Sequence, residues 1–373
     1  MPMLQGCLNG PHTANGRAGV PVTPAHLAQA ASDAVAAGAD SLHVHPKDDR
    51  GHDSVDPECV GAALTAIRRA VAGVSIGVTT GAWTEPDPIR RVQLVAGWEE
   101  LPDFASVNWH EPGAEEVARA LLNRGVGVEA GLWYADVAER FARDPLAPEC
   151  LRILIEVTEQ DVHSATATAA AIERVVHGLG SPLLLHGEGD VAWPMVGRAL
   201  RCGLDTRIGL EDTASLPDGT PTRSNGELVS AVRARIAAVG AADERLMGRS
   251  VRVASRHRPP DRAPIRVNTG DQVRVGERDD EWPAFVLLTM PDDGSGWVPS
   301  RHLAVSGGGK AVAARDYDTT ELDVDIGVEL IVIEADTLSG WLWCRRPGGR
   351  CGWLPVTRLD PLDLKEPACD SQP

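Results

Sequence analysis

The chain has 373 residues, of which 43% are hydrophobic and 24% are charged, and its formal net charge is −17. It is longer than a typical single domain, because a barrel of about 250 residues would leave about 120 residues for a second region. No stretch approaches the ~18 consecutive apolar residues of a membrane span, and the net negative charge disfavours contact with phosphate backbones. We therefore expect neither membrane insertion nor nucleic-acid binding.

The cysteines and the N-terminus point to an intracellular protein. The seven cysteines are scattered and include no C-x-x-C pair, which argues against a disulfide framework and against a cysteine-bound zinc. The opening sequence MPMLQGCLNG lacks the basic start, the apolar stretch and the cleavage site of a secretory signal. A cytoplasmic location is the expectation.

Short apolar runs alternate with amphipathic helical patterns from the N-terminus to about residue 240. This alternation is typical of repeated βα units around a parallel sheet. Eight strands close a TIM barrel, whereas an open six-stranded sheet would leave two apolar runs unpaired. We therefore predict an α/β protein with a (β/α)₈ barrel over residues 1–246. The predicted strands are residues 3–8, 41–45, 74–78, 104–107, 127–132, 151–157, 182–186 and 206–210, and the predicted helices include residues 24–37, 57–72 and 225–239.

The helical periodicity ends after about residue 246. The sequence SRHRPPDRAP is followed by short Val-rich runs and Trp-containing turns, which are typical of an all-β region. GDQV at 270–273 leads to GWVP at 296–299, and GVEL at 327–330 leads to GWLP at 352–355. This repeat predicts two copies of a small barrel, at residues 247–306 and 310–362. Residues 306–310 (SGGGK) would be a flexible joint, and residues 363–373 a disordered tail.

Two histidines, His43 and His45, end the second predicted strand. Because side chains alternate along a strand, both point to one side, at the end where TIM barrels place their active sites. Two imidazoles suit a divalent metal, although a hydrogen-bonded pair explains an isolated H-x-H about as often. Glu211, at the end of the eighth strand, can supply a third ligand. Two histidines and one carboxylate leave a coordination position open, as in catalytic zinc sites, and the same set also serves ferrous iron.

Eight segments between residues 3 and 240 carry a family resemblance. They are LNG (8–10), VPVTP (20–24), AGA (37–39), HVHP (43–46), TTG (79–81), SVN (106–108), EPG (111–113) and RIGLED (207–212). In order and context they resemble the β-keto acid cleavage enzymes, a family that includes the 3-keto-5-aminohexanoate cleavage enzyme of lysine fermentation. The resemblance implies an acyl-CoA-forming transferase that condenses a β-keto acid with acetyl-CoA and yields acetoacetate and a new acyl-CoA through a retro-Claisen step. It also implies one Zn²⁺ per subunit, acetyl-CoA as co-substrate and a homo-oligomer.

The resemblance assigns roles to individual residues. His43, His45 and Glu211 would bind zinc, and Arg207 and Asp212 would be a catalytic pair in which the guanidinium holds the carboxylate that helps generate the base. A Lewis acid beside a base suits this chemistry, and an ordinary ion pair at the barrel rim is the alternative. For Glu129, at a strand end, a buried structural hydrogen bond is the alternative to substrate binding. The candidate substrate-binding residues are Thr79, Ser106, Asn108, Glu111 and Glu129.

The sequence departs from the lysine-fermentation enzyme near the first strand. That enzyme has an acidic residue in a T-G-A-E stretch where this chain has NGPH at 9–12. The carboxylate expected to pair with a substrate amine is missing, which argues against an amino-bearing substrate.

The C-terminal region resembles SH3 domains, through AARDY (313–317), ELDV (321–324), Trp341 and GWLP (352–355). SH3 domains cradle a polyproline helix in an aromatic groove, and Tyr317, Trp341 and Pro355 occupy three matching positions. Arg315 and Arg358 stand where groove tyrosines normally lie. We therefore expect the two modules to pack on the barrel or on a neighbouring subunit rather than to capture a peptide.

Two other functions compete with C–C bond cleavage. Metal-dependent TIM-barrel hydrolases also carry H-x-H, but on the first strand, with histidines after strands five and six, where this chain has Glu129 and Glu156. A non-catalytic scaffold that works through its SH3-like modules would be favoured by loss of a metal ligand or of Arg207, and neither is lost.

Overall fold

The computed structural model describes residues 2–13, 16–307 and 309–364. The chain divides into two compact units, one of residues 1–234 with 305–309 and one of residues 235–304 with 310–373. Within the described residues, no helix combines the length and the apolar character needed to cross a bilayer.

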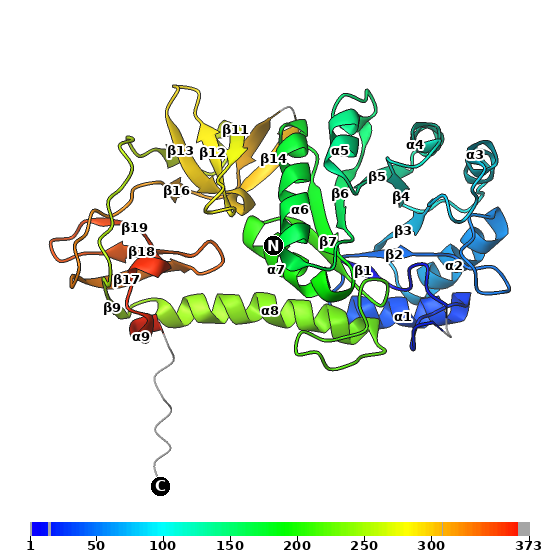
Figure 1. Ribbon diagram of the computed structural model, residues 1–373, viewed down its shortest axis with the longest axis horizontal. Helices are drawn as coiled ribbons and strands as arrows, with labels where there is room; N and C mark the ends of the chain where they lie inside the picture. Colours follow the sequence, from blue (N-terminus) through cyan, green and yellow to red (C-terminus); the bar gives the residue numbers. More distant parts are fainter. Residues whose placement is uncertain (1, 14–15, 308, 365–373) are drawn as a thin grey trace, which may run out of the picture. The chain divides into compact units, whose positions relative to one another are not determined.

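The first unit contains a closed barrel of eight parallel strands in sequential order, with β8 paired to β1. This confirms the predicted (β/α)₈ architecture. Strands β1 to β7 are labelled in Figure 1, where their colours run from blue to green. The strands are buried along almost their whole length, which explains why apolar runs rather than alternation mark them in the sequence. The strands are β1 (Leu4–Cys7), β2 (Ser41–Val44), β3 (Ser75–Thr79), β4 (Phe104–Asn108), β5 (Gly127–Leu132), β6 (Arg152–Val157), β7 (Leu183–Gly187) and β8 (Asp205–Ile208).

Several barrel helices begin at caps that the sequence supplies. Thr23, Asp56 and Asp87 each precede a proline, and each side chain accepts a hydrogen bond from a backbone N–H of the first turn. The cap satisfies an N–H that has no partner within the helix, and proline at the first helical position needs none. The helices are α1 (Pro24–Ala36), α2 (Pro57–Ala70), α3 (Pro88–Ala96), α4 (Ala114–Leu122), α5 (Ala135–Phe141), α6 (Val162–Val176), α7 (Ala192–Cys202) and α8 (Asn225–Leu246).

Two glycines allow the end of β8 to approach the end of β1. A Cβ at Gly209 would lie 1.8 Å from the backbone oxygen of Cys7. Gly10 has φ +55°, and a Cβ there would lie 2.5 Å from Cγ of Glu211. The LNG and RIGLED segments are therefore in direct contact where the barrel closes.

The second unit is mainly β-structure. Its sheets have the orders β13-β12-β11-β15-β14, β19-β18-β17-β9 and β10-β16. This confirms the all-β character of the C-terminal region. The elements are β9 (Ser250–Arg252), β10 (Arg266–Val267), β11 (Gln272–Arg278), β12 (Phe285–Thr289), β13 (Ser295–Pro299), β14 (Leu303–Gly307), β15 (Lys310–Ala313), β16 (Tyr317–Asp318), β17 (Glu329–Asp336), β18 (Trp341–Arg345), β19 (Cys351–Pro355) and α9 (Pro361–Leu364).

The two larger sheets are interleaved along the chain. Strand β9 lies at the start of the first predicted module but pairs with β17, where Val251 lies opposite Leu330. Strand β15 opens the second predicted module but pairs with β11, where Ala311 lies opposite Val273. The expected flexible joint at 306–310 instead carries the end of β14 and the start of β15, with Gly308 outside the described residues. Of the expected tail, residues 363–364 end α9 and residues 365–373 lie outside the described residues.

The tight contact at Gly209 predicts a large effect of one methyl group. Gly209→Ala is expected to destabilise the protein by more than about 3 kcal/mol, because the three clashing atoms, the backbone O, C and N of Cys7, are buried. Gly240→Ala, at an exposed site in α8 with nothing within 4 Å of the new Cβ, should stabilise it by about 1 kcal/mol. Thermal unfolding followed by circular dichroism compares the two variants. A Gly209→Ala protein with the same Tm as the wild type would contradict the close contact between Gly209 and Cys7.

Candidate active site

One cavity of about 200 Å³ gathers most of the predicted site residues at the C-terminal ends of the barrel strands. Trp83, Trp133, Glu156 and Glu188 also line it. Its position is the usual one for the active site of a TIM barrel. The predicted residues that line it are His43, His45, Thr79, Ser106, Asn108, Arg207 and Glu211.

His43, His45 and Glu211 form a candidate metal centre. Their ligand atoms lie within 4.8 Å of one another, and all three side chains are buried. Nε2 of His45 is 3.5 Å from Oε1 of Glu211. Within the described structure, Nδ1 of His43 and Oε2 of Glu211 are buried without a hydrogen-bond partner, which is costly unless a ligand supplies one. Two imidazoles and one carboxylate fit Zn²⁺ and leave room for a further ligand.

The two histidines differ in their affinity for protons. Burial lowers the pKa of His43 to about 3, so its ring is neutral at physiological pH. Burial also opposes protonation of His45, but the carboxylates of Glu211 and Asp53 outweigh it and raise the pKa of His45 to about 9. Because a histidine ligand is a neutral imidazole, metal binding at neutral pH has to displace a proton from His45.

Asp53, which the sequence did not reveal as a site residue, holds the ring of His45. Its Oδ2 accepts hydrogen bonds from Nδ1 of His45 at 2.8 Å and from Nε1 of Trp83 at 2.7 Å. Nζ of Lys47 is buried, bonds to the same carboxylate and donates to the backbone oxygen of Gly10 at 2.6 Å. These contacts direct Nε2 of His45 towards Glu211, as a supporting carboxylate does in many zinc sites.

The backbone of His45 is fixed by Asn9. Oδ1 of Asn9 accepts from the His45 N–H at 2.8 Å, and its Nδ2 donates to the His45 oxygen at 2.8 Å and to the Pro21 oxygen at 3.1 Å. Asn225 makes a similar pair of bonds, from the N–H of Leu210 and to the oxygen of Leu8. The asparagine of the LNG segment thus positions the metal-ligand strand.

A buried network centres on Arg207. Its Nη2 donates to Oε1 of Glu211 at 2.8 Å and to Oδ1 of Asp212 at 3.2 Å. Asp212 is fully buried and does not line the cavity, and its Oδ1 lies 3.3 Å from Nδ1 of His186. Nε2 of His186 lies 3.4 Å from Oε2 of Glu156. The predicted Arg207–Asp212 pair is therefore in contact, and Asp212 is linked to the cavity through Arg207 and through His186 and Glu156.

Two predicted substrate-binding residues do not line the cavity. Glu129 is fully buried, and its Oε2 accepts from Nε2 of Gln5 at 3.1 Å and lies 3.1 Å from Nε of Arg152. It makes the buried structural contact that was the alternative interpretation. Oε1 of Glu111 accepts from Nδ2 of Asn108 at 3.0 Å, so Glu111 orients a residue that does line the cavity.

Glu188, which was not predicted, lines the cavity from the turn after β7. The turn is fixed, because the Glu188 N–H donates to the oxygen of Val157 and the Gly189 N–H donates to the oxygen of Asp212 at 2.8 Å. Burial and the neighbouring Glu156 raise the pKa of Glu188 to about 7. Its carboxylate forms no hydrogen bond or ion pair with another described residue. A rigidly presented carboxylate without a protein partner is available to a ligand.

The contact between Asp53 and His45 predicts an effect on metal affinity. Asp53→Asn is expected to weaken Zn²⁺ binding about 10- to 100-fold, because the amide holds the imidazole less firmly than a carboxylate does. Competition with a chromophoric chelator measures the affinity. Asp49→Asn, exposed in the same loop, is the control and should bind Zn²⁺ like the wild type. Equal affinities of the two variants would show that Asp53 does not support the metal ligand.

Comparison with known proteins assigns the chain to a family. Residues 3–243 match the model of the beta-keto acid cleavage enzyme family. The chain is 26% identical over 229 residues to the 3-keto-5-aminohexanoate cleavage enzyme of Fusobacterium nucleatum subsp. nucleatum, which covers 57% of this chain and 82% of the relative. It is 24% identical over 229 residues to the enzyme of the same name from Acetoanaerobium sticklandii, which covers 57% of this chain and 83% of the relative.

A solved structure shares the fold. The ternary complex of ObcA with a C4-CoA adduct and oxalate matches with a TM-score of 0.50 and 17% identity, over 59% of this chain. This chain spans 64% of the length of that structure, and at this identity the likeness concerns the fold alone. The family match instead covers the whole barrel and every residue of the candidate metal centre. The chain therefore belongs to the β-keto acid cleavage enzyme family.

Proposed function

We propose that the protein is a zinc-dependent enzyme that converts a β-keto acid and acetyl-CoA into acetoacetate and a new acyl-CoA. The observation that carries the proposal is the convergence of His43, His45 and Glu211 beside the buried Arg207 in one cavity. Family membership supplies the class of reaction. Acetyl-CoA as co-substrate rests on the resemblance of the site motifs to the family.

Zn²⁺ bound by the three ligands would polarise the keto group and stabilise the enolate-like charge that develops beside it. Arg207 holds Glu211 and Asp212 in place, so that the positions of both carboxylates are set before the substrate arrives. Thr79, Ser106 and Asn108 line the same cavity. Their hydroxyl and amide groups can donate hydrogen bonds to the carboxylate of the substrate.

The reaction balances without a redox cofactor. Deprotonation of the substrate needs a base at the cavity, and Asp212, which does not line the cavity, would help to generate that base through its contacts with Arg207 and His186. The resulting carbanion attacks the thioester carbonyl of acetyl-CoA and expels the CoA thiolate, which then adds to the keto carbon of the condensed intermediate. The bond between the keto carbon and the carbon next to the carboxylate breaks last, so that acetoacetate leaves as an enolate that takes up a proton and the remaining acyl group leaves as acyl-CoA. CoA passes from the acetyl group to the remaining acyl group.

Glu188 bears on the substrate. The absence of an acidic residue at 9–12 argued against an amino-bearing substrate, but Glu188 brings a carboxylate to the cavity from the end of another strand. Both curated relatives are named for a substrate with an amino group. We therefore propose that the substrate carries a cationic or hydrogen-donating group near Glu188.

The central experiment combines metal analysis with a substrate panel. Purified protein should contain zinc and release acetoacetate from acetyl-CoA and at least one of a series of cationic, apolar and anionic β-keto acids. Arg207→Lys should lower kcat at least about 100-fold, because the flexible ammonium group of lysine does not reproduce the fixed position from which Nη2 of Arg207 contacts both carboxylates. Arg201→Lys, at an exposed site on α7, is the control. A zinc protein that turns over no β-keto acid but hydrolyses amides or lactones would be a metal-dependent hydrolase instead.

The role of Glu188 predicts a change in specificity. Glu188→Gln should lower kcat/KM for cationic β-keto acids about 10- to 100-fold and leave apolar ones nearly unchanged, since only the charge is lost. In the wild type, KM for a cationic substrate should fall as the pH rises through about 7, where Glu188 ionises near Glu156, His186, Asp212 and Glu211. Asp190→Asn, exposed in the same turn, should change neither quantity. Equal losses of kcat/KM for cationic and apolar substrates in Glu188→Gln would contradict the proposal that Glu188 recognises a cationic group.

A further inference from the structure

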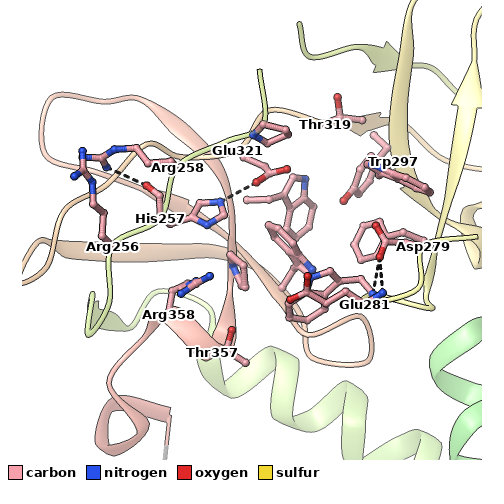
Figure 2. A pocket seen from close by; sticks show the side chains of 17 residues that line it. Arg256, His257, Arg258, Asp279, Glu281, Trp297, Thr319, Glu321, Thr357 and Arg358 are labelled. Atoms are coloured by element: carbon pink, nitrogen blue, oxygen red, sulfur yellow. Dashed lines mark hydrogen bonds and ion pairs between the residues drawn. The ribbon is translucent and has the colours of Figure 1, made fainter. Parts of the chain in front are cut away.

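A second cavity, of about 580 Å³, is lined by both larger sheets of the second unit (Figure 2). None of the residues that we assign to the C–C cleavage reaction lines this cavity. Strands β12 and β13 contribute Phe285 and Trp297, and strands β18 and β19 contribute Trp341 and Trp353. Tyr317 of β16 and Trp282 of the loop before β12 complete the aromatic wall.

The aromatic side chains of this wall support one another. The rings of Trp282 and Trp341 meet edge to face, with centroids 5.3 Å apart, and the rings of Tyr317 and Trp353 stack at 5.3 Å. Trp282 and Trp297 are only partly buried, so part of their surface is open. Aromatic faces carry partial negative charge and attract cations, most strongly when the ring is an indole.

Carboxylates add to this negative potential. Figure 2 shows Asp279 and Glu281 on the side of the cavity away from Arg256 and Arg258. Oδ1 of Asp279 accepts from the N–H of Glu281 at 2.9 Å and from that of Trp282 at 2.8 Å, which fixes the loop. Glu281 is exposed, and its carboxylate makes no ion pair with another described residue.

The arginines on the rim do not cancel these carboxylates. Arg258 is paired with Asp323 at 2.5 Å and with Asp325 at 2.7 Å, and Nε of Arg256 lies 3.3 Å from Asp325. Arg358 is the one arginine of the lining without an ion pair among the described residues. Two lining carboxylates without an ion pair among the described residues, those of Asp279 and Glu281, therefore face one guanidinium without one, and the third lining carboxylate, Glu321, contacts His257.

The chain itself already places a nitrogen heterocycle on this wall. Nε2 of His257 lies 2.7 Å from Oε2 of Glu321, and its ring meets that of Trp341 edge to face at 6.0 Å. The backbone of His257 forms a bridge with Val324. This segment covers one side of the cavity, and Tyr317, Trp341 and Trp353 are packed into the core of the five-stranded sheet. The remaining space suits a compact ligand better than an extended polyproline helix.

We propose that this cavity binds an organic cation, an alkylammonium or guanidinium group that rests against the indole rings and is balanced by Asp279 and Glu281. The cation can belong to a free small molecule or to the side chain of a lysine or arginine in another protein. Charge, ring chemistry and size all favour such a ligand over a phosphate or a carboxylate.

Titration of the full chain tests the proposal. Choline is compared with 3,3-dimethylbutanol, which has the same shape without the charge, and with the peptide Gly-Arg-Gly, and binding is followed by calorimetry and tryptophan fluorescence. Choline or the peptide should bind saturably, at least about tenfold more tightly than the neutral isostere, and more weakly at high salt. Preference for choline indicates a free small molecule, and preference for the peptide indicates a basic side chain. Both outcomes support a cation site.

Matched variants locate the binding. Glu281→Gln should weaken cation binding at least about threefold and Trp297→Leu at least about fivefold, whereas Glu277→Gln, exposed on β11 outside the cavity, should have no effect. Circular dichroism checks that each variant is folded, and acetoacetate release should be unchanged in Glu281→Gln. The proposal is overturned if the neutral isostere binds as tightly as choline and the peptide, if no cation binds to the folded wild type, or if phosphate binds more tightly than either cation.

Discussion

The site depends on one buried positive charge. The guanidinium of Arg207 is 2% exposed and contacts two carboxylates that follow each other in sequence, Glu211 and Asp212. Burying such groups costs several kcal/mol per charge unless each finds a partner, so neither carboxylate can leave the arginine without a large loss of free energy. This constraint directs Glu211 towards His45 and Asp212 towards His186. Arg207 therefore holds both Glu211, which takes part in the proposed metal binding, and Asp212, which takes part in the proposed proton transfer.

The same interaction ties the metal centre to the closure of the barrel. Strand β1 pairs with both β8 and β2, so Glu211 after β8 and His45 after β2 flank the loop that follows β1. In that loop Asn9 holds the backbone of His45, and Gly10 leaves room for the side chain of Glu211. The ligands can converge only if β8 and β1 are in register. The metal centre can therefore form only when the barrel closes.

Sequence reasoning predicted where a residue lies when that place follows from its position on a strand. His43 and His45 share a strand end, and RIGLED marks another, so their convergence follows from barrel geometry. Depth within a strand was harder to predict. Glu129 and Glu156 both stand on barrel strands, but Glu129 lies level with Arg152 at the start of β6 and pairs with it, whereas Glu156 lies near the end of that strand and reaches the cavity. Asp53 and Glu188 lie in loops, where no periodicity says which way a side chain points. In the C-terminal region the repeat indicated two modules, but not that each sheet takes a strand from the other segment, because the local pattern of a strand does not identify its partner.

Because each of the two sheets takes a strand from the other segment, neither sheet can be completed early in synthesis on the ribosome. Arg252, at the end of β9, precedes its neighbour Glu329 by 77 residues, so β9 emerges long before the strand that completes it. In the meantime its edge is open to wrong partners, and closing so long a loop slows assembly. The five-stranded sheet is likewise incomplete until β15 has been synthesised, because β15 belongs to the second repeat. A nascent chain that stalls between the repeats would have neither sheet finished, so both repeats have to be synthesised before either sheet is complete.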